Sequence, residues 1–135
     1  MDYGDKTIGV AVSDPLGVMA LGAETIRRER ESAIKPSLRR LGELMAEYGA
    51  ETIVLGLPLN MNGSEGERCA KTRAFKAKFE ARFPNAEVVL WDERLSTAGA
   101  MRTLDNREKI DEMAAVFILQ GYMDYLAKKD EEARN

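Results

Sequence analysis

Residues 88–97 read VVLWDERLST, an apolar run that stops at two carboxylates and a guanidinium. A short, continuous apolar run of this kind is typical of a strand buried on both faces of a parallel sheet. Residues 52–57, which read TIVLGL and precede Pro58, have the same character. Side chains that bind ligands gather at the carboxyl ends of such strands. We therefore expect Asp92 and Glu93 to lie at the functional edge of the sheet.

The segments around these two strands predict an antiparallel hairpin and three helices. After the segment that holds Asp2, predicted strands cover residues 7–12, 19–28, 52–57 and 88–91. Helical spacing of apolar residues predicts helices over residues 32–48, 64–83 and 109–128, and the S-E-G-E at 64–67 has the form of a capping box. This order predicts one domain over residues 1–135 with an α/β fold. Its mixed five-stranded sheet would combine an antiparallel hairpin with parallel strands and be flanked by helices.

Composition excludes several kinds of active site. The chain has no histidine, so Ser-His-Asp catalysis, Cys-His catalysis and histidine metal sites are excluded. Hydrolytic chemistry must then depend on carboxylates, on lysine, or on a metal ion held by oxygen ligands. The net charge of -3 argues against a generally basic coat, although a local basic face is compatible with nucleic acid. The single Cys69 and the lack of a long apolar run favour a cytoplasmic protein without a membrane span.

Three acids form the candidate catalytic and metal-binding site. Asp2 precedes the hairpin, Glu93 ends the last strand, and Asp111 stands near the start of the last helix. The spacing of that helix places five residues on one face: Asp111, Ala114, Ala115, Ile118 and Tyr122. The small alanines would let the helix approach the sheet, so that Asp111 reaches the strand ends. Clustered carboxylates repel one another unless a cation neutralises them; Mg²⁺ or Mn²⁺ suits oxygen ligands, and two such ions about 4 Å apart can hydrolyse a phosphodiester.

A further set of residues could contact the phosphates of a substrate. Residues 60–64 lead into a predicted helix N-terminus, where backbone N–H groups can hold a phosphate. The helix that follows has a basic excess, which is usually a solvated face but can also follow a phosphate chain. Its phenylalanines, Phe75, Phe79 and Phe83, fit core packing better than base stacking. The candidate substrate-binding residues are Lys6, Asn60, Asn62, Ser64, Arg73, Lys76 and Arg94.

The sequence resembles the YqgF family, also called RuvX, in four characteristic blocks. They are DYGDKTIGVAVSD at 2–14, VLGLPLNMNGSEG at 54–66, WDERLST at 91–97 and KIDEMAAVFILQGYMD at 109–124. The family is similar to the Holliday-junction resolvase RuvC within the ribonuclease H-like superfamily. This resemblance implies a ribonuclease H-like fold and a nuclease, with processing of the 5′ end of pre-16S ribosomal RNA as the usually assigned role. By motif position it also implies an acidic site of Asp2, Glu93 and Asp111.

Two features depart from the family pattern. Family members carry several apolar residues before the D-Y-G block, whereas residue 2 here is already the aspartate of that block. The first strand is therefore expected to be either truncated or unusually short. Residues 104–108, LDNRE, form a shorter and less basic stretch than the lysine-rich loop of the family, and this puts the affinity for substrate in question.

Each acid of the candidate site also has a structural interpretation. Glu93 and Arg94 could form a surface ion pair at the strand end. Asp111 could be a helix N-terminal acid that the helix dipole favours. Asp2 could be a turn former, and Asp14, which precedes a proline, is expected to be one.

Several functions remain open from the sequence. A metal-dependent nuclease that acts on structured RNA explains the three acids and the lack of histidine. A Holliday-junction resolvase-like endonuclease would act on branched DNA and would need two sites related by two-fold symmetry, hence a homodimer. A non-catalytic nucleic-acid-binding module would not need the acids. A sugar-kinase or actin-like ATPase is a further alternative, because the D-x-G block resembles the first phosphate loop of those proteins. Such a protein needs two domains of this kind, and 135 residues supply one.

Overall fold

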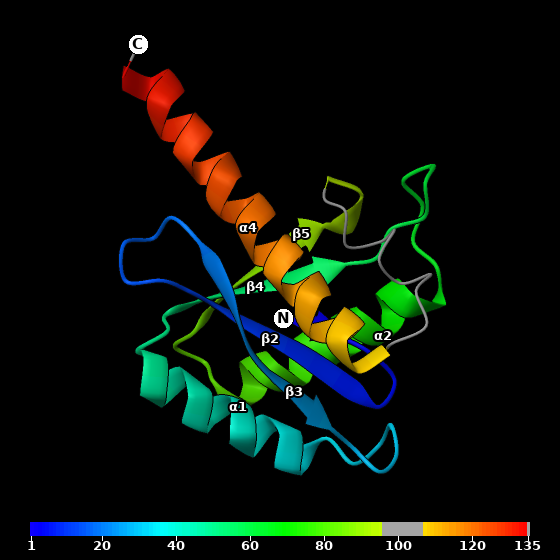
Figure 1. Ribbon diagram of the computed structural model, residues 1–135. Coiled ribbons are helices and arrows are strands. Elements are labelled where there is room, and N and C mark those ends of the chain that lie inside the picture. Colours follow the sequence, from blue (N-terminus) through cyan, green and yellow to red (C-terminus); the bar gives the residue numbers. More distant parts are fainter. Residues whose placement is uncertain (96–106, 135) are drawn as a thin grey trace.

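A computed structural model describes residues 1–95 and 107–134, and of residues 107–111 it gives the helical backbone only (Figure 1). The described strands are β1 (Asp2–Tyr3), β2 (Thr7–Ser13), β3 (Ala20–Arg27), β4 (Thr52–Leu57) and β5 (Glu87–Asp92). The described helices are α1 (Lys35–Tyr48), α2 (Glu67–Arg82), the 3₁₀ turn η1 (Glu93–Leu95) and α4 (Arg107–Arg134). The predicted strands and helices are therefore present, in the predicted order.

The strands form two sheets of different kinds. β1, β2 and β3 make an antiparallel sheet of three strands, while β4 and β5 make a parallel pair. The amino group of Met1 donates to the carbonyl of Val54 at 2.6 Å, and the carbonyl of Met1 accepts from the N–H of Gly56 at 3.1 Å. The two sheets thus meet at Met1, immediately before β1. The mixed α/β class, with antiparallel and parallel strands, is confirmed.

Beyond Met1 the facing edges of β2 and β4 are separated by a cavity of about 350 Å³. Its lining includes Val12 and Ser13 of β2, Thr52 and Ile53 of β4, and Leu41 of α1. β1 lies between β2 and β4 at one end of the strands, and this cavity lies beyond it along the same two strands.

The turn between β2 and β3 is built by Asp14, as the sequence predicts. One carboxylate oxygen of Asp14 accepts hydrogen bonds from the backbone N–H groups of Val18 (2.8 Å) and Met19 (3.0 Å). These hydrogen bonds to Met19 and Val18 hold the pKa of Asp14 below its usual value. Asp14 therefore has a structural role, away from the candidate site.

The first core lies between the strands and helices α1 and α2. Leu38, Leu41 and Leu44 project from α1 into the same buried cluster as Phe75 and Phe79 of α2. In that cluster the ring of Phe75 stacks on Tyr3, with centroids 4.5 Å apart. The prediction that these phenylalanines pack in the core is confirmed. α1 ends at Tyr48 and is followed by Gly49, whose φ of 63° is left-handed and suits glycine, which agrees with the predicted stop.

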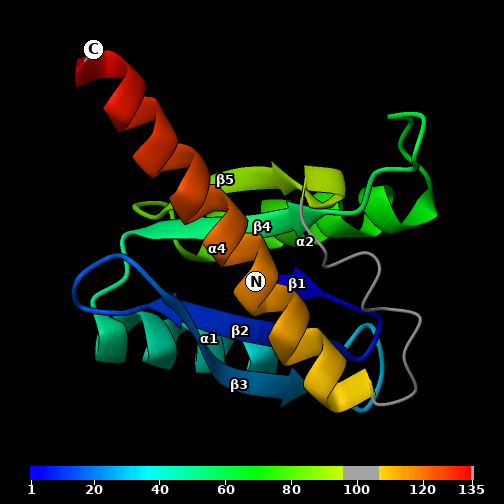
Figure 2. The same cartoon turned by 45° about the horizontal axis from the view of Figure 1, so that its top comes forward.

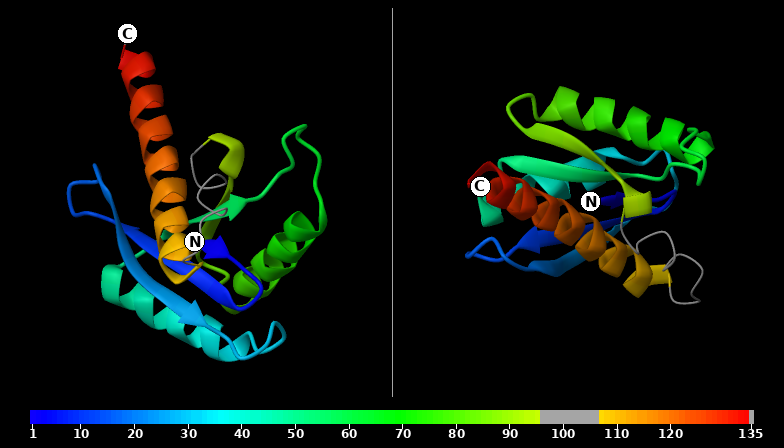
Figure 3. Two further views of the ribbon diagram at one scale, coloured as in Figure 1. Left: turned by 45° about the vertical axis from the view of Figure 1, so that its right-hand side comes forward. Right: turned by 90° about the horizontal axis from the view of Figure 1, so that it is seen from above.

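Helix α4 covers the opposite side of the strands from α2 (Figure 3). Ala114, Ala115 and Ile118 are fully buried and Tyr122 is partly buried, which confirms these four members of the predicted inner face of this helix. Farther along, a Cβ placed on Gly121 would lie 3.2 Å from the ring of Trp91, so small residues allow close contact there too. The C-terminal part of α4 continues past the strands (Figure 2). No helix in the described parts of the chain has the length and apolarity that a membrane span requires.

The predicted capping box at the start of α2 is wrong. The helix begins at Glu67, and the residue at its N-cap is Gly66, without a side-chain cap. The hydroxyl of Ser64 instead donates to the amide oxygen of Asn62 at 2.6 Å. The side chain of Ser64 therefore forms a hydrogen bond within the preceding loop and does not cap the helix.

The close packing of α4 predicts the effect of a larger side chain at Ala114. Ala114→Leu should lower the free energy of unfolding by about 1–3 kcal/mol, because a well-packed contact cannot take the added volume without strain. Ala77→Leu on the exposed face of α2 is the matched control, and should change it by less than about 0.5 kcal/mol. Urea unfolding followed by the fluorescence of Trp91, the single tryptophan, makes the comparison. Equal stability of the two variants would contradict the close helix–sheet contact.

Candidate functional site

Asp2 and Glu93 are brought to the same buried region from different sheets. Asp2 opens β1 with 1% of its surface exposed, and Glu93 opens η1 directly after β5 with 4% exposed. The side chain of Glu93 lies over Gly56, where a Cβ would be 3.1 Å from the Cγ and Cδ of that glutamate. Since Gly56 is hydrogen-bonded to Met1, the chain neighbour of Asp2, the two acids lie on either side of the junction between the sheets.

The electrostatics of Met1 support this placement of the two acids. Burial lowers the pKa of the Met1 amino group from 8.0 to about 6, while the nearby charges of Asp2 and Glu93 act in the opposite direction. Both carboxylates are therefore close enough to act on one ammonium group. Carboxylates are rarely buried to this extent unless they are paired or bind a cation, because desolvation of the charge is costly.

The third acid, Asp111, lies outside the described side chains. Its backbone belongs to α4, one turn before the buried Ala114 and Ala115. The prediction that Asp111 joins Asp2 and Glu93 therefore stays a prediction. Among the described residues, no group of three or more possible ligand side chains is arranged to hold a metal ion. The two buried carboxylates nevertheless supply hard oxygen donors, and these fit Mg²⁺ or Mn²⁺.

Arg94 forms an ion pair with Asp92 and not with Glu93. Its guanidinium lies 2.8 Å from a carboxylate oxygen of Asp92, and its backbone N–H donates to the same carboxylate at 2.9 Å. The guanidinium of Arg94 holds the pKa of Asp92 below its usual value. The interpretation of Glu93 and Arg94 as a surface ion pair is therefore wrong, because Asp92 takes the arginine and Glu93 is buried.

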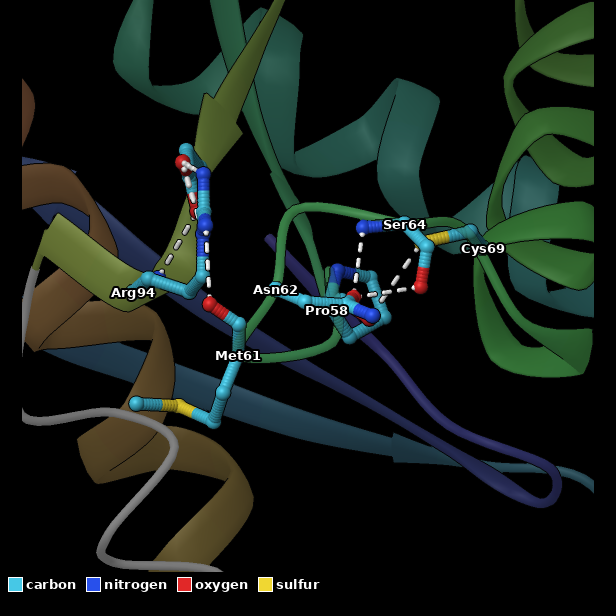
Figure 4. Close-up of polar contacts among 7 residues, drawn as sticks. Pro58, Met61, Asn62, Ser64, Cys69 and Arg94 are labelled. Atoms are coloured by element: carbon cyan, nitrogen blue, oxygen red, sulfur yellow. Dashed lines mark hydrogen bonds and ion pairs between the residues drawn. The ribbon is translucent and has the colours of Figure 1, made fainter.

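Arg94 also fastens the loop between β4 and α2 to the end of β5 (Figure 4). It donates to the carbonyl of Met61 at 3.2 Å, and its guanidinium lies close to Gly63, where a Cβ would be 3.4 Å from Nη1. Gly63 has a φ of 86°, so a side chain there would be strained as well as close to Arg94. The loop is thus positioned beside Glu93.

The three polar candidates of this loop are bonded to one another. Asn60 donates to the hydroxyl of Ser64 at 3.0 Å, while the amide oxygen of Asn62 accepts from the backbone N–H (3.0 Å) and the hydroxyl of Ser64. These hydrogen bonds shape the loop, so the three side chains have a structural role there. Contact of Asn60, Asn62 and Ser64 with a substrate stays a prediction.

The basic candidates differ in how their charges are balanced. Arg73 forms two hydrogen bonds with Glu65, at 2.6 and 3.0 Å, and Lys76 lies 2.9 Å from Glu80. Lys6 is exposed on the turn between β1 and β2. The structure therefore brings only some of the seven substrate-binding candidates together. Arg94 contacts the loop that holds Asn60, Asn62 and Ser64, and Arg73 reaches the same loop through Glu65. Lys76 lies one turn farther along α2, and Lys6 lies on the turn between β1 and β2.

Arg28 is a residue near the site that the sequence does not single out. It is only 6% exposed, and it donates to the backbone carbonyls of Gly4 (2.6 Å) and Asp5 (2.5 Å). Its guanidinium also lies over the ring of Tyr3, 4.8 Å from the centroid. Arg28 thus holds the turn that follows Asp2. In the sequence it stands within RRER, residues 27–30, which reads as an exposed charge run and gives no signal of burial.

The comparisons with known proteins agree on one family. The family model described as "RuvX: Holliday junction resolvase" matches residues 1–125. A protein of Agathobacter rectalis is 48% identical over 135 residues, which cover 94% of each chain. Proteins of Acetivibrio thermocellus (43% over 136 residues, 95% of each chain) and Geobacillus kaustophilus (48% over 132 residues, 92% of this chain and 94% of the relative) are similar at comparable length. All three relatives bear the name "Putative pre-16S rRNA nuclease". The chain therefore belongs to the RuvX family.

Proposed function

We propose that this protein is a metal-dependent nuclease that hydrolyses a phosphodiester at the 5′ end of pre-16S ribosomal RNA, a step of ribosome biogenesis in the cytoplasm. The observation that carries the proposal is the burial of Asp2 and Glu93 at the junction of the two sheets. The names of the relatives supply the substrate, and membership of the RuvX family supports nuclease chemistry. A non-catalytic binding module would have no need to bury two carboxylates.

We further propose that the two sheets act as one five-stranded sheet of the ribonuclease H-like type. The order of strands would be β3-β2-β1-β4-β5, with β1 between β2 and β4. The two backbone hydrogen bonds of Met1 to Val54 and Gly56 support this order, because they have the direction of a parallel ladder. In this arrangement Asp2 and Glu93 stand at the same edge, where ligands bind in α/β sheets.

In this mechanism Asp2, Glu93 and Asp111 would hold Mg²⁺ or Mn²⁺. When bound, two such ions activate a water molecule and stabilise the leaving oxygen of the phosphodiester. The chain itself keeps Asp2 and Glu93 away from bulk water. Arg28 fixes the turn that follows Asp2, and the Asp92–Arg94 pair fixes the loop beside Glu93. These contacts pre-arrange the site before the substrate arrives.

A four-way DNA junction is the alternative substrate, because the description of the family model names a Holliday junction resolvase. With both substrates offered in parallel, we expect cleavage of pre-16S ribosomal RNA in Mg²⁺ or Mn²⁺, and its loss in EDTA. Gel analysis of both reactions makes the comparison. Cleavage of the junction alone would favour the alternative, and cleavage that persists in EDTA would contradict a metal-dependent mechanism.

The acids of the site should act on the chemical step and not on the fold. Glu93→Gln and Asp111→Asn should each lower the single-turnover rate by more than about 100-fold, since loss of a direct ligand should exceed the effect of outer contacts. Asp111→Asn should leave the melting temperature in EDTA unchanged or raise it, because it removes repulsion among carboxylates.

Asp130→Asn is the matched control for Asp111→Asn, because Asp130 is an exposed acid on the same helix. Its cleavage rate and melting temperature should equal those of the unchanged protein. Wild-type cleavage by Asp111→Asn would remove Asp111 from the proposed catalytic site.

A further inference from the structure

An open groove between α1 and α2 is lined by cations alone among its charged residues. The groove has a volume of about 850 Å³ and lies between the first half of α1 and the last turns of α2. Its charged lining consists of Lys35 and Arg39 from the α1 side and Lys78 and Arg82 from α2, and all four are exposed. We call this feature the α1–α2 groove. Such a concentration of positive charge stands out in a chain whose net charge is -3.

Most of the other cations on the same helices are paired with acids, although Arg68 of α2 takes part in none of the ion pairs among described residues. Arg40 of α1 binds Glu24 at 2.8 Å, and on α2 Lys71 lies 3.1 Å from Asp5. The four cations of the α1–α2 groove take part in none of the ion pairs that join described residues. Within the described parts of the chain, the fold thus neutralises Arg40 and Lys71 but not the cations of the groove.

The spacing of these cations is unfavourable within each helix, although Arg82 in the last turn of α2 is favoured by the helix dipole. Lys35 and Arg39 stand four residues apart, as do Lys78 and Arg82, and like charges at this spacing destabilise a helix. Lys35 also occupies the first turn of α1, where the helix dipole favours acids, and no acid is present in that turn. Repulsion between like charges on one helix is expected where these charges bind an anionic partner.

We propose that the α1–α2 groove binds the sugar-phosphate backbone of the RNA, at a site separate from Asp2 and Glu93. The proposal rests on the proposed nuclease function and adds an anchoring surface to it. Two cations on each wall can contact a phosphate chain that enters the groove from both sides, and arginine binds phosphate with paired hydrogen bonds. A flat anionic membrane would reach only the rim. Contacts of this type position a nucleic acid without reading its sequence.

The salt dependence of RNA binding tests the groove directly. Lys35→Gln with Arg39→Gln and Lys78→Gln with Arg82→Gln each remove two charges, so each pair should flatten the plot of log affinity against log salt by about 1.4, and all four changes by about 3. At low salt the fourfold variant should bind at least about tenfold more weakly. Filter binding of pre-16S ribosomal RNA across a salt series measures both effects.

The matched control is Lys128→Gln with Lys129→Gln, which removes two exposed cations from the far part of α4. It should keep the wild-type slope, and all variants should keep the single-turnover rate at saturating protein, since the groove does not touch the reacting phosphate. The fourfold variant should melt at or above the wild-type temperature, because like charges are removed. Should it melt lower, the two paired variants still give the slope.

Two outcomes separate the groove from the function on which it rests. Wild-type slopes in both paired variants, with RNA still bound and cleaved by the unchanged protein, overturn the groove and leave the nuclease proposal standing. If the unchanged protein neither binds nor cleaves this RNA, both proposals fail. A last experiment measures binding of the unchanged protein and the fourfold variant to vesicles of phosphatidylserine and phosphatidylcholine. Vesicle binding that is lost in the fourfold variant, while RNA binding is unchanged, overturns the proposal in favour of a membrane surface.

Discussion

The lack of a side chain at Gly56 is the constraint on which the rest of the site depends. A Cβ at this position would lie 2.5 Å from Ile118 of α4 and 3.1 Å from Glu93. Only glycine therefore lets α4 settle on β4 while Glu93 turns inward across the same strand. The N–H of Gly56 also bonds to Met1, so one residue governs the helix contact, the position of an acid and the junction of the sheets.

Positive charge is used in three different ways around this framework. Arg28 is buried and serves backbone carbonyls, which fixes a turn. Arg94 pairs with Asp92 and reaches a loop carbonyl, so its charge serves the loop and not Glu93. The cations of the α1–α2 groove have neither role, and this separates them from side chains that stabilise the fold. Placement therefore tells more than net charge about where a polyanion could bind.

The sequence predicted the features that repeat along the chain. The apolar runs at 52–57 and 88–91 and the inner face of α4 follow local periodicity, and the structure agrees with them. The predicted capping box is wrong because Ser64 bonds to Asn62, and the alternative of a Glu93–Arg94 ion pair is wrong because Arg94 pairs with Asp92. Each case is a choice between neighbouring partners, which spacing alone does not decide.

Features made by residues distant in sequence were beyond such reasoning. Arg28 looked like part of an exposed charge run, since its partners belong to the turn more than twenty residues earlier in the chain. The α1–α2 groove likewise exists only because the fold places Lys35 near Lys78. In both cases the sequence shows the residue types but not which distant residues the fold places next to them.

The meeting of the two sheets at Met1 has a consequence for motion. Asp2 belongs to the antiparallel sheet and Glu93 follows the parallel one, so the two carboxylates are carried by different sheets. Because both acids lie beside the Met1 contact, a rotation of one sheet relative to the other about that contact would move the far ends of the strands more than it would move the acids. The spacing of the acid pair is thus insensitive to such a motion, and the apolar core shared by both sheets limits the rotation itself.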